Sequence, residues 1–155
     1  MKKYELTEET FTVFGKTLYR IRAVRDFGSV KTGEFGGYIE KEENLSHFGN
    51  AWVYGNAKVY GDARVSGNAR VYGNAEVFNT RHFFVQGPIG SRDGYVTFYR
   101  TKDDTVEVRC GCFSGSLQEF VNQVEETHGG SRYEKEYKLA AELAKVCIRL
   151  EGESR

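Results

Sequence analysis

The chain has 155 residues, of which 39% are hydrophobic, so it is long enough for one compact unit with two subregions but not for two large domains. The chain has 22 basic residues (Lys and Arg) and 22 acidic residues (Asp and Glu). This balance argues against non-specific electrostatic binding of DNA or RNA. The N-terminus carries no apolar run, so the sequence predicts neither a signal peptide nor a transmembrane helix, and we expect a cytoplasmic protein.

Residues 1–36 predict a small β cap. Two strand-like runs, 11–14 and 18–23, flank Gly15 and Lys16, which are typical of a hairpin turn. The glycine-rich segment 32–40 then leads the chain into the central region.

The middle of the chain repeats every six residues. Five units run from Gly49 to Phe78: GNAWVY, GNAKVY, GDARVS, GNARVY and GNAEVF. A six-residue period is typical of a parallel β-helix. The alanine and valine of each unit lie two positions apart, so both point to the coil interior, and the Gly-Asn or Gly-Asp pairs suit sharp corners. The pattern resembles the hexapeptide-repeat proteins, which implies a short left-handed parallel β-helix over residues 37–80 with three faces per coil.

Three faces per coil predict that residues 18 apart stack in neighbouring coils at about 4.8 Å. Val53 then lies over Val71, and Lys58 lies over Glu76. A stack of little more than two coils needs caps and further burial. The outward aromatic residues are therefore expected to form subunit contacts in a homo-oligomer, a trimer by analogy with hexapeptide-repeat proteins: Trp52, Tyr54, Tyr60 and Tyr72.

Residues 81–155 predict an α+β module. Strand patterns cover 82–86, 95–101 and 105–110, and the last two form an antiparallel hairpin. Ser116 and Glu119 form a capping box at the start of a helix that stops near His128. A second helix follows Ser131 and carries apolar residues on two adjacent stripes.

Nearly the whole chain resembles small proteins of bacteriophages and prophages that combine hexapeptide repeats with a C-terminal α+β module. The resemblance rests on two entry motifs, Gly36-Gly37-Tyr38-Ile39-Glu40 and Asn44-Leu45-Ser46, and on a series of later motifs: Ile89-Gly90-Ser91-Arg92, Cys110-Gly111-Cys112-Phe113, Glu119-Phe120, Thr127-His128-Gly129 and Glu136-Tyr137. It implies a phage origin and action in the cytoplasm of the host bacterium. By analogy with oligomeric phage proteins that act on host defence, it also implies an anti-defence role.

The turn after Ile89 is the main candidate for a ligand site. Backbone N–H groups around Gly90 and Ser91 can form an anion nest that Arg92 completes, and Arg109 is expected nearby if its strand pairs with residues 82–86. Tyr95 and Tyr99 are the nearest aromatic residues for stacking. The alternative is an ordinary glycine turn with a surface arginine.

Other chemistry is less well supported by the sequence. Cys110 and Cys112 supply two thiols, whereas a structural zinc site needs four ligands, so we assign no metal; their alternative role is packing. His128 beside Cys112 would be needed for a nucleophile–base pair. His47 is the only histidine near the repeats, and we interpret it as a residue of the coil entry and not as an acyltransferase base.

The sequence therefore predicts a non-enzymatic binding protein that traps a phosphate-bearing signalling nucleotide at subunit interfaces, with no cofactor. Two alternatives stay open. The first is an oligomeric protein that binds and blocks a host defence protein. The second is a structural, polymer-forming component of the phage.

Overall fold

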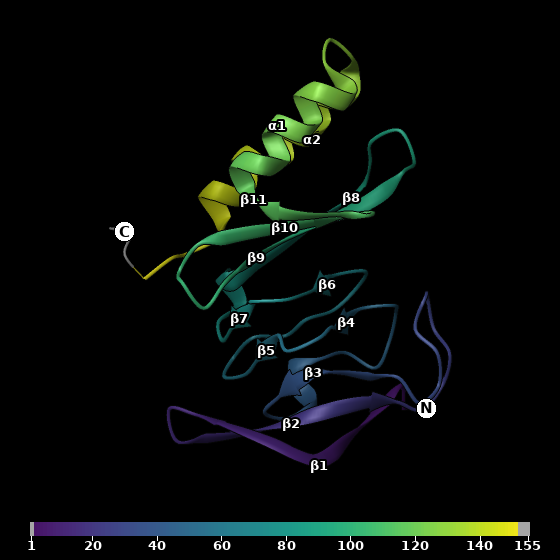
Figure 1. Cartoon of the computed structure of the whole chain (residues 1–155), viewed down its shortest axis with the longest axis vertical. Helices are drawn as coiled ribbons and strands as arrows, with labels where there is room; N and C mark the ends of the chain where they lie inside the picture. Colours follow the sequence, from purple (N-terminus) through teal and green to yellow (C-terminus); the bar gives the residue numbers. More distant parts are fainter. Residues whose placement is uncertain (1, 152–155) are drawn as a thin grey trace. The chain divides into compact units, whose positions relative to one another are not determined.

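A computed structural model describes residues 2–151. The chain is mainly β with an α+β part at its C-terminal end, as expected. It divides into two compact units, Met1–Thr80 and Arg81–Arg155 (Figure 1). No helix within residues 2–151 has both the length and the apolar character needed to cross a bilayer.

The first unit begins with an antiparallel hairpin of β1 (Tyr4–Val13) and β2 (Lys16–Ala23). Val13 pairs with Lys16, so the two turn residues are Phe14 and Gly15, one position earlier than predicted. Both have positive φ, 48° and 77°, which is the conformation that a tight two-residue hairpin requires. The hairpin forms as expected, and glycine takes the second turn position.

A mixed sheet continues from this hairpin in the order β1-β2-β3-β5-β7. β3 (Phe35–Ile39) is antiparallel to β2, whereas β5 (Lys58–Val59) and β7 (Glu76–Val77) add in parallel. β4 (Trp52–Val53) and β6 (Arg70–Val71) form a separate parallel pair. A short 3-10 helix, η1 (Glu42–Asn44), precedes an isolated parallel bridge between Leu45 and Val65.

The parallel pairs have the register that the repeat predicts. Val53 pairs with Val71 and Lys58 pairs with Glu76, each 18 positions apart. The predicted interior is also confirmed, because all five repeat alanines are at most 3% exposed and all five repeat valines are 0% exposed. The five corner glycines have φ between 58° and 71°, which favours glycine at every corner.

The second unit is a four-stranded antiparallel sheet in the order β11-β10-β9-β8. Its strands are β8 (Phe83–Ile89), β9 (Gly94–Arg100), β10 (Val106–Cys110) and β11 (Phe113–Ser116), after the 3-10 helix η2 (Thr80–His82). The sequence patterns identified the first three strands, and β11 was not predicted. Its FSGS sequence has a single large apolar residue, so it carries little strand signal.

Two helices, α1 (Leu117–His128) and α2 (Arg132–Cys147), lie on the same side of this sheet (Figure 1). The predicted capping box starts α1: the Ser116 side chain accepts the Glu119 N–H, and the Glu119 carboxylate accepts the Ser116 N–H. Helices and sheet share one buried cluster: Val96, Phe98, Val108, Phe120, Val124, Tyr137, Ala140, Ala141, Ala144 and Ile148. This cluster fixes both helices against one face of the sheet, and Ile89, directly before the candidate turn, packs against it.

Candidate functional site

The turn that joins β8 to β9 runs from Gly90 to Asp93. Gly90 has φ 81° and Asp93 has φ 50°, and the Asp93 N–H donates to the Gly90 carbonyl at 3.3 Å. Ser91 and Arg92, at the tip, are exposed. The sequence therefore places a short, polar turn at the surface, as predicted.

Helix α2 holds this turn through two consecutive side chains. The Gly90 N–H donates to Oε1 of Glu136 at 2.7 Å, and Glu136 also lies 3.8 Å from Nε of Arg132. A Cβ at position 90 would overlap the Tyr137 hydroxyl, so only glycine lets the backbone approach the tyrosine this closely. One N–H of the predicted anion nest is thus occupied by an internal carboxylate.

Tyr137 connects the turn to the rest of the module. It is 9% exposed, and its hydroxyl is hydrogen-bonded to the Cys110 thiol. Burial, followed by Cys110 and Glu136, raises the pKa of Tyr137, whereas the positive charge of Arg92 acts in the opposite direction. The His128 ring lies 5.5 Å from the tyrosine ring. Four motifs that are far apart in the sequence therefore meet around one tyrosine.

Arg109 does not join Arg92 at this place, because β10 pairs with β9 and β11 and not with β8, which holds residues 83–89. Its neighbours Val108 and Cys110 pack in or against the helix-side cluster, so strand alternation directs Arg109 to the other face of the sheet. Its partner across β9 is Thr97. The predicted clamp of Arg92 and Arg109 does not form on one face of this unit.

The two predicted stacking residues differ in their surroundings. Tyr99 pairs with Glu107, projects from the same face as Arg109 and is fully buried. Burial is the main cause that raises the pKa of Tyr99, and the charge of Glu107 adds to it. Tyr95 is 39% exposed and lies two residues after the turn, and alternation along β9 directs it, like Tyr99, to the sheet face opposite the helices.

The predicted exposure of the repeat aromatics is wrong for two of the four. Trp52 is 0% exposed because Tyr4 and Phe27 pack on it edge-on, at 6.1 and 5.1 Å between ring centroids. Tyr60 is 3% exposed in a cluster with Leu18 and Tyr38. The N-terminal segment covers both residues. A contact with another subunit is left as a prediction for Tyr54 and Tyr72, whose rings stack at 3.9 Å and 5°.

His47 has both ring nitrogens engaged. Nδ1 accepts the Lys3 N–H at 3.0 Å, so Nε2 carries the proton that it donates to Oε1 of Glu42 at 2.8 Å. Its ring stacks on Tyr4 at 4.1 Å and 12°. These contacts fit the interpretation of His47 as a coil-entry residue.

All three cysteines are free thiols, with Cys112 exposed and the other two half-buried. Within residues 2–151, no group of three or more His, Cys, Asp or Glu side chains converges as metal ligands do. Gly111 and Cys112 form the turn between β10 and β11, and Gly111 has φ 55°. The cysteine pair therefore lies at a hairpin end, and Cys110 contacts Tyr137.

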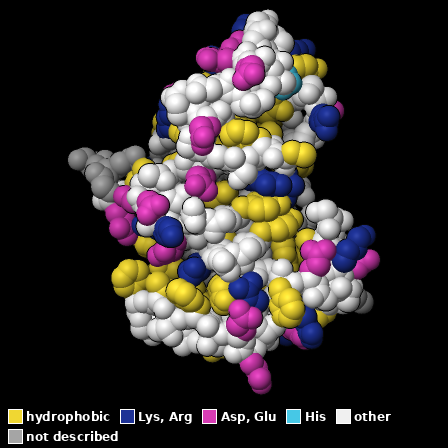
Figure 2. Space-filling model, in the orientation of Figure 1, with side chains coloured by type: hydrophobic (Ala, Val, Ile, Leu, Met, Phe, Trp, Pro, Cys, Tyr) yellow, Lys and Arg dark blue, Asp and Glu magenta, His cyan; other side chains and the backbone are white. Residues whose placement is uncertain are grey.

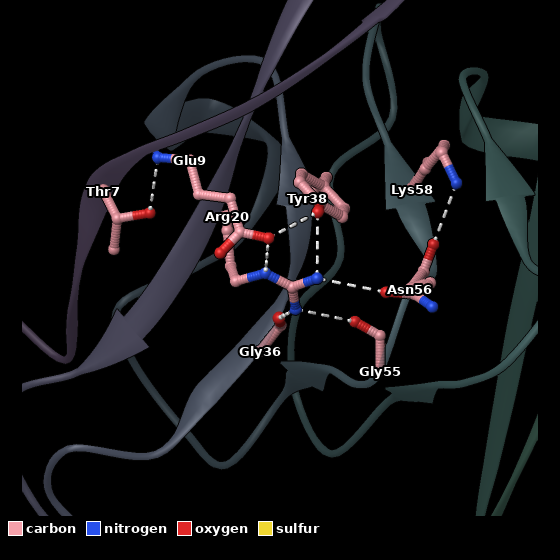
Figure 3. A network of polar contacts seen from close by, with 8 residues as sticks. All are labelled: Thr7, Glu9, Arg20, Gly36, Tyr38, Gly55, Asn56 and Lys58. Atoms are coloured by element: carbon pink, nitrogen blue, oxygen red, sulfur yellow. Dashed lines mark hydrogen bonds and ion pairs between the residues drawn. The ribbon is translucent and has the colours of Figure 1, made fainter.

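The most connected polar residue of the first unit is Arg20 (Figure 3). Its Nε donates to Glu9 at 2.9 Å, Nη1 donates to two carbonyl oxygens, and Nη2 donates to two side-chain oxygens. The acceptors of Nη1 and Nη2 are Gly36 O, Gly55 O, Tyr38 Oη and Asn56 Oδ1. All its donor groups are used, so Arg20 joins the hairpin to the repeat and is not available to a ligand.

Sequence reasoning did not assign a role to Glu136 or Tyr137, although both belong to a motif of the phage resemblance. The available signal was their position on the face of α2 that also carries Ala140 and Ala144. Figure 2 shows acidic and basic side chains interspersed on the visible face of the described chain, which is not the broad basic surface typical of nucleic-acid binding. Neither the models of known families nor the curated proteins give a match to this chain.

Proposed function

We propose that the chain is a non-enzymatic binding protein that holds a phosphate-bearing nucleotide at the turn Gly90–Asp93. The observation that carries this proposal is the anchoring of an exposed turn by α2, through the hydrogen bond from Gly90 to Glu136. A turn fixed in this way loses little entropy on binding. It presents Ser91 as a hydrogen-bond donor and Arg92 as a cation.

The ligand meets a mixed electrostatic environment at this turn. Glu136 is negative, and Arg92 together with Arg132 supplies two positive charges. An anion therefore binds on the Arg92 side, where Ser91 and Arg92 are exposed, and leaves Glu136 on the Gly90 N–H. The partly exposed ring of Tyr95 is the stacking surface for a base, which would extend from the turn to the sheet face opposite the helices.

Arg109 can contact a ligand bound at Arg92 only if the two arginines come from different subunits. It projects from the sheet face opposite to the helices, so within one copy it is directed away from Arg92. A ligand held between subunits would bring the two arginines together from different copies. This is why the proposal includes an interfacial site.

We further propose that residues 37–80 form a short left-handed β-helix as a rigid scaffold. The 18-residue register of the pairs Val53–Val71 and Lys58–Glu76 supports three faces per coil. The buried alanines and valines support a continuous coil interior. The handedness is part of the proposal, and an experimental structure of the repeat tests it.

The proposed assembly is a homotrimer, in which the partner is a second copy of this chain. The outward side of α2 exposes three aliphatic residues at helical spacing: Leu139 at 70%, Leu143 at 46% and Val146 at 69%. The Tyr54–Tyr72 stack is the second candidate contact.

A phage origin and an anti-defence role in the host cytoplasm belong to the same proposal and rest on the sequence resemblance. The experiment measures depletion of nucleotide. The protein is mixed with cyclic and linear signalling nucleotides and removed by filtration, and the nucleotide left in the filtrate is quantified. The retained protein is then heated, and the nucleotide that it releases is quantified. We expect one nucleotide class to be depleted and then released intact. Release of a cleaved product contradicts a non-enzymatic trap. Absence of depletion, together with capture of a host protein, favours the blocking alternative.

A further inference from the structure

Two cations lie against one aromatic ring in the first unit. Nζ of Lys3 lies 4.8 Å from the centroid of the Phe27 ring, and Cζ of Arg25 lies 5.9 Å from the same centroid. Lys3 is fully buried and donates to the carbonyl oxygens of Ala51, at 2.6 Å, and Gly49, at 3.5 Å. Phe27 is 6% exposed, so this arrangement belongs to the interior of the unit.

Not all N–H donors of Arg25 are hydrogen-bonded within the described residues. Its Nη2 donates to the His47 carbonyl at 3.1 Å, and its Nε is buried without a hydrogen-bond partner among the described residues. Arginine has five N–H donors, and Arg20 in the same unit uses every donor nitrogen. A buried, unused N–H is destabilising unless an acceptor is supplied from outside the chain.

The positive charge of Arg25 acts on Lys3. Burial, and then the positive charge of Arg25, lower the pKa of Lys3 to about 8. Asp26, the residue after Arg25, accepts hydrogen bonds from the Thr32 N–H and hydroxyl. Glu42 accepts hydrogen bonds from His47 and Lys2. Within the described residues, the charge that acts on Lys3 is positive, and a negative ligand would relieve it.

We propose that Arg25, with Lys3 behind it, is a binding site for a small doubly charged oxyanion, such as sulfate or the phosphate group of a metabolite. The oxyanion accepts from the unused N–H groups of the Arg25 guanidinium, whose side chain is partly exposed. Lys3 contributes charge from its position against the Phe27 ring, and its hydrogen bonds to Gly49 and Ala51 stay in place. This site lies in the first unit and is independent of the turn at Gly90.

Sulfate is the first probe, because it keeps its double charge across the neutral and alkaline range. Calorimetric titration at constant ionic strength is expected to show saturable binding to the wild-type protein and at least tenfold weaker binding to Arg25→Gln. Arg22→Gln, which removes an exposed charge three residues away, is the matched control and is expected to bind as wild type does. No saturable binding to wild type, or equal binding by Arg25→Gln, overturns the proposal.

The dependence of sulfate affinity on pH in the alkaline range gives a second test on the wild-type protein. As the pH rises from 7 to 9.5, Lys3 loses its proton, and sulfate affinity is expected to fall several-fold; in Lys3→Met it stays flat. If either variant fails to fold, the Arg25 Nε–H resonance of the wild-type protein is followed by NMR during the titration. A shift of that resonance supports the site, and an unchanged resonance contradicts it.

A nucleoside monophosphate in place of sulfate distinguishes the two sources of the oxyanion. Tighter binding of the monophosphate indicates a phosphate ester as the ligand, and equal binding indicates the free ion. Arg92→Ala is expected to retain the sulfate binding that depends on Arg25. Loss of sulfate binding in Arg92→Ala alone, with Arg25→Gln unaffected, supports the proposed turn site and contradicts this one.

Discussion

The Gly90 N–H and the Glu136 carboxylate, 46 residues apart, are joined by a hydrogen bond of 2.7 Å. The bond connects the start of a hairpin turn to the first half of α2. Because an ionised acceptor strengthens such a bond, it fixes the turn more firmly than a neutral contact would. The exposed residues Ser91 and Arg92 therefore stand on an anchored support.

Replacing Gly90 by alanine is expected to destabilise the protein by about 2–4 kcal/mol, because a side chain at φ 81° is strained and its Cβ would overlap the Tyr137 hydroxyl. Gly111→Ala is the control, since Gly111 also has positive φ but has no atom within 4 Å of the added Cβ. That variant should lose only about 1 kcal/mol. Urea unfolding measures both. Equal losses would show that the close approach to Tyr137 does not matter.

Arg20→Met is expected to lower the free energy of unfolding by about 2–4 kcal/mol, because it leaves the carbonyls of Gly36 and Gly55 without their donor and removes the contact with Tyr38. Arg22→Met is the matched change on the same strand. It breaks only an exposed ion pair with Glu5 and should cost at most about 1 kcal/mol. A similar cost for both variants would mean that the Arg20 network does not join the hairpin to the repeat.

Stability is expected to rise between pH 8 and pH 10, because the pKa of Lys3 is about 8 in the folded protein and 10.5 as the unperturbed reference. In this window the unfolded chain binds more protons than the folded chain, so deprotonation favours folding. The gain is on the order of 2 kcal/mol. Burial raises the pKa of Tyr4, which lowers stability only above about pH 10.

Urea midpoints at pH 7.5 and pH 9.5 check this expectation, with Lys3→Met as the comparison. The variant should lose the pH dependence of the wild type. A wild-type midpoint that stays constant or falls over this interval would contradict the burial of a charged Lys3.

Assembly is tested by changes at the two candidate contacts. Leu143→Glu and Tyr72→Glu are each expected to lower the molar mass measured by light scattering during gel filtration, because each places a charge in an apolar contact. Asn122→Glu, at an exposed position of α1, is the control and should leave the mass unchanged. A monomeric wild-type protein at micromolar concentration removes the proposed trimer.

The repeat could be predicted from sequence because its signal is local. The pairing of Val53 with Val71 follows from a period that the chain displays five times over, and the interior follows from the alternation of small and branched residues. The capping box at Ser116 is local for the same reason. Such features depend on neighbours in sequence and not on the tertiary fold.

The predictions that were wrong, and the contact that was missed, depend on residues far apart in the sequence. Trp52 occupies an outward position of the repeat, and only the arrival of Tyr4 and Phe27 from the N-terminal segment buries it. Arg109 was expected near Arg92 if its strand paired with residues 82–86, but β10 pairs with β9 and β11 instead, and alternation along β10 directs Arg109 to the other face of the sheet. The anchor at Glu136 was missed because a carboxylate on a helix gives no sequence signal of a partner in a distant turn.

The central claim is that Arg92 on its anchored turn binds a phosphate-bearing nucleotide. Isothermal titration of the nucleotide found by depletion, into wild type and Arg92→Ala, tests it most directly. A charge-assisted contact contributes about 1.5–3 kcal/mol, so we expect Arg92→Ala to bind at least about tenfold more weakly, Ser91→Ala to lose less, and Arg64→Ala to bind as wild type does. Equal affinity of wild type and Arg92→Ala would contradict the claim.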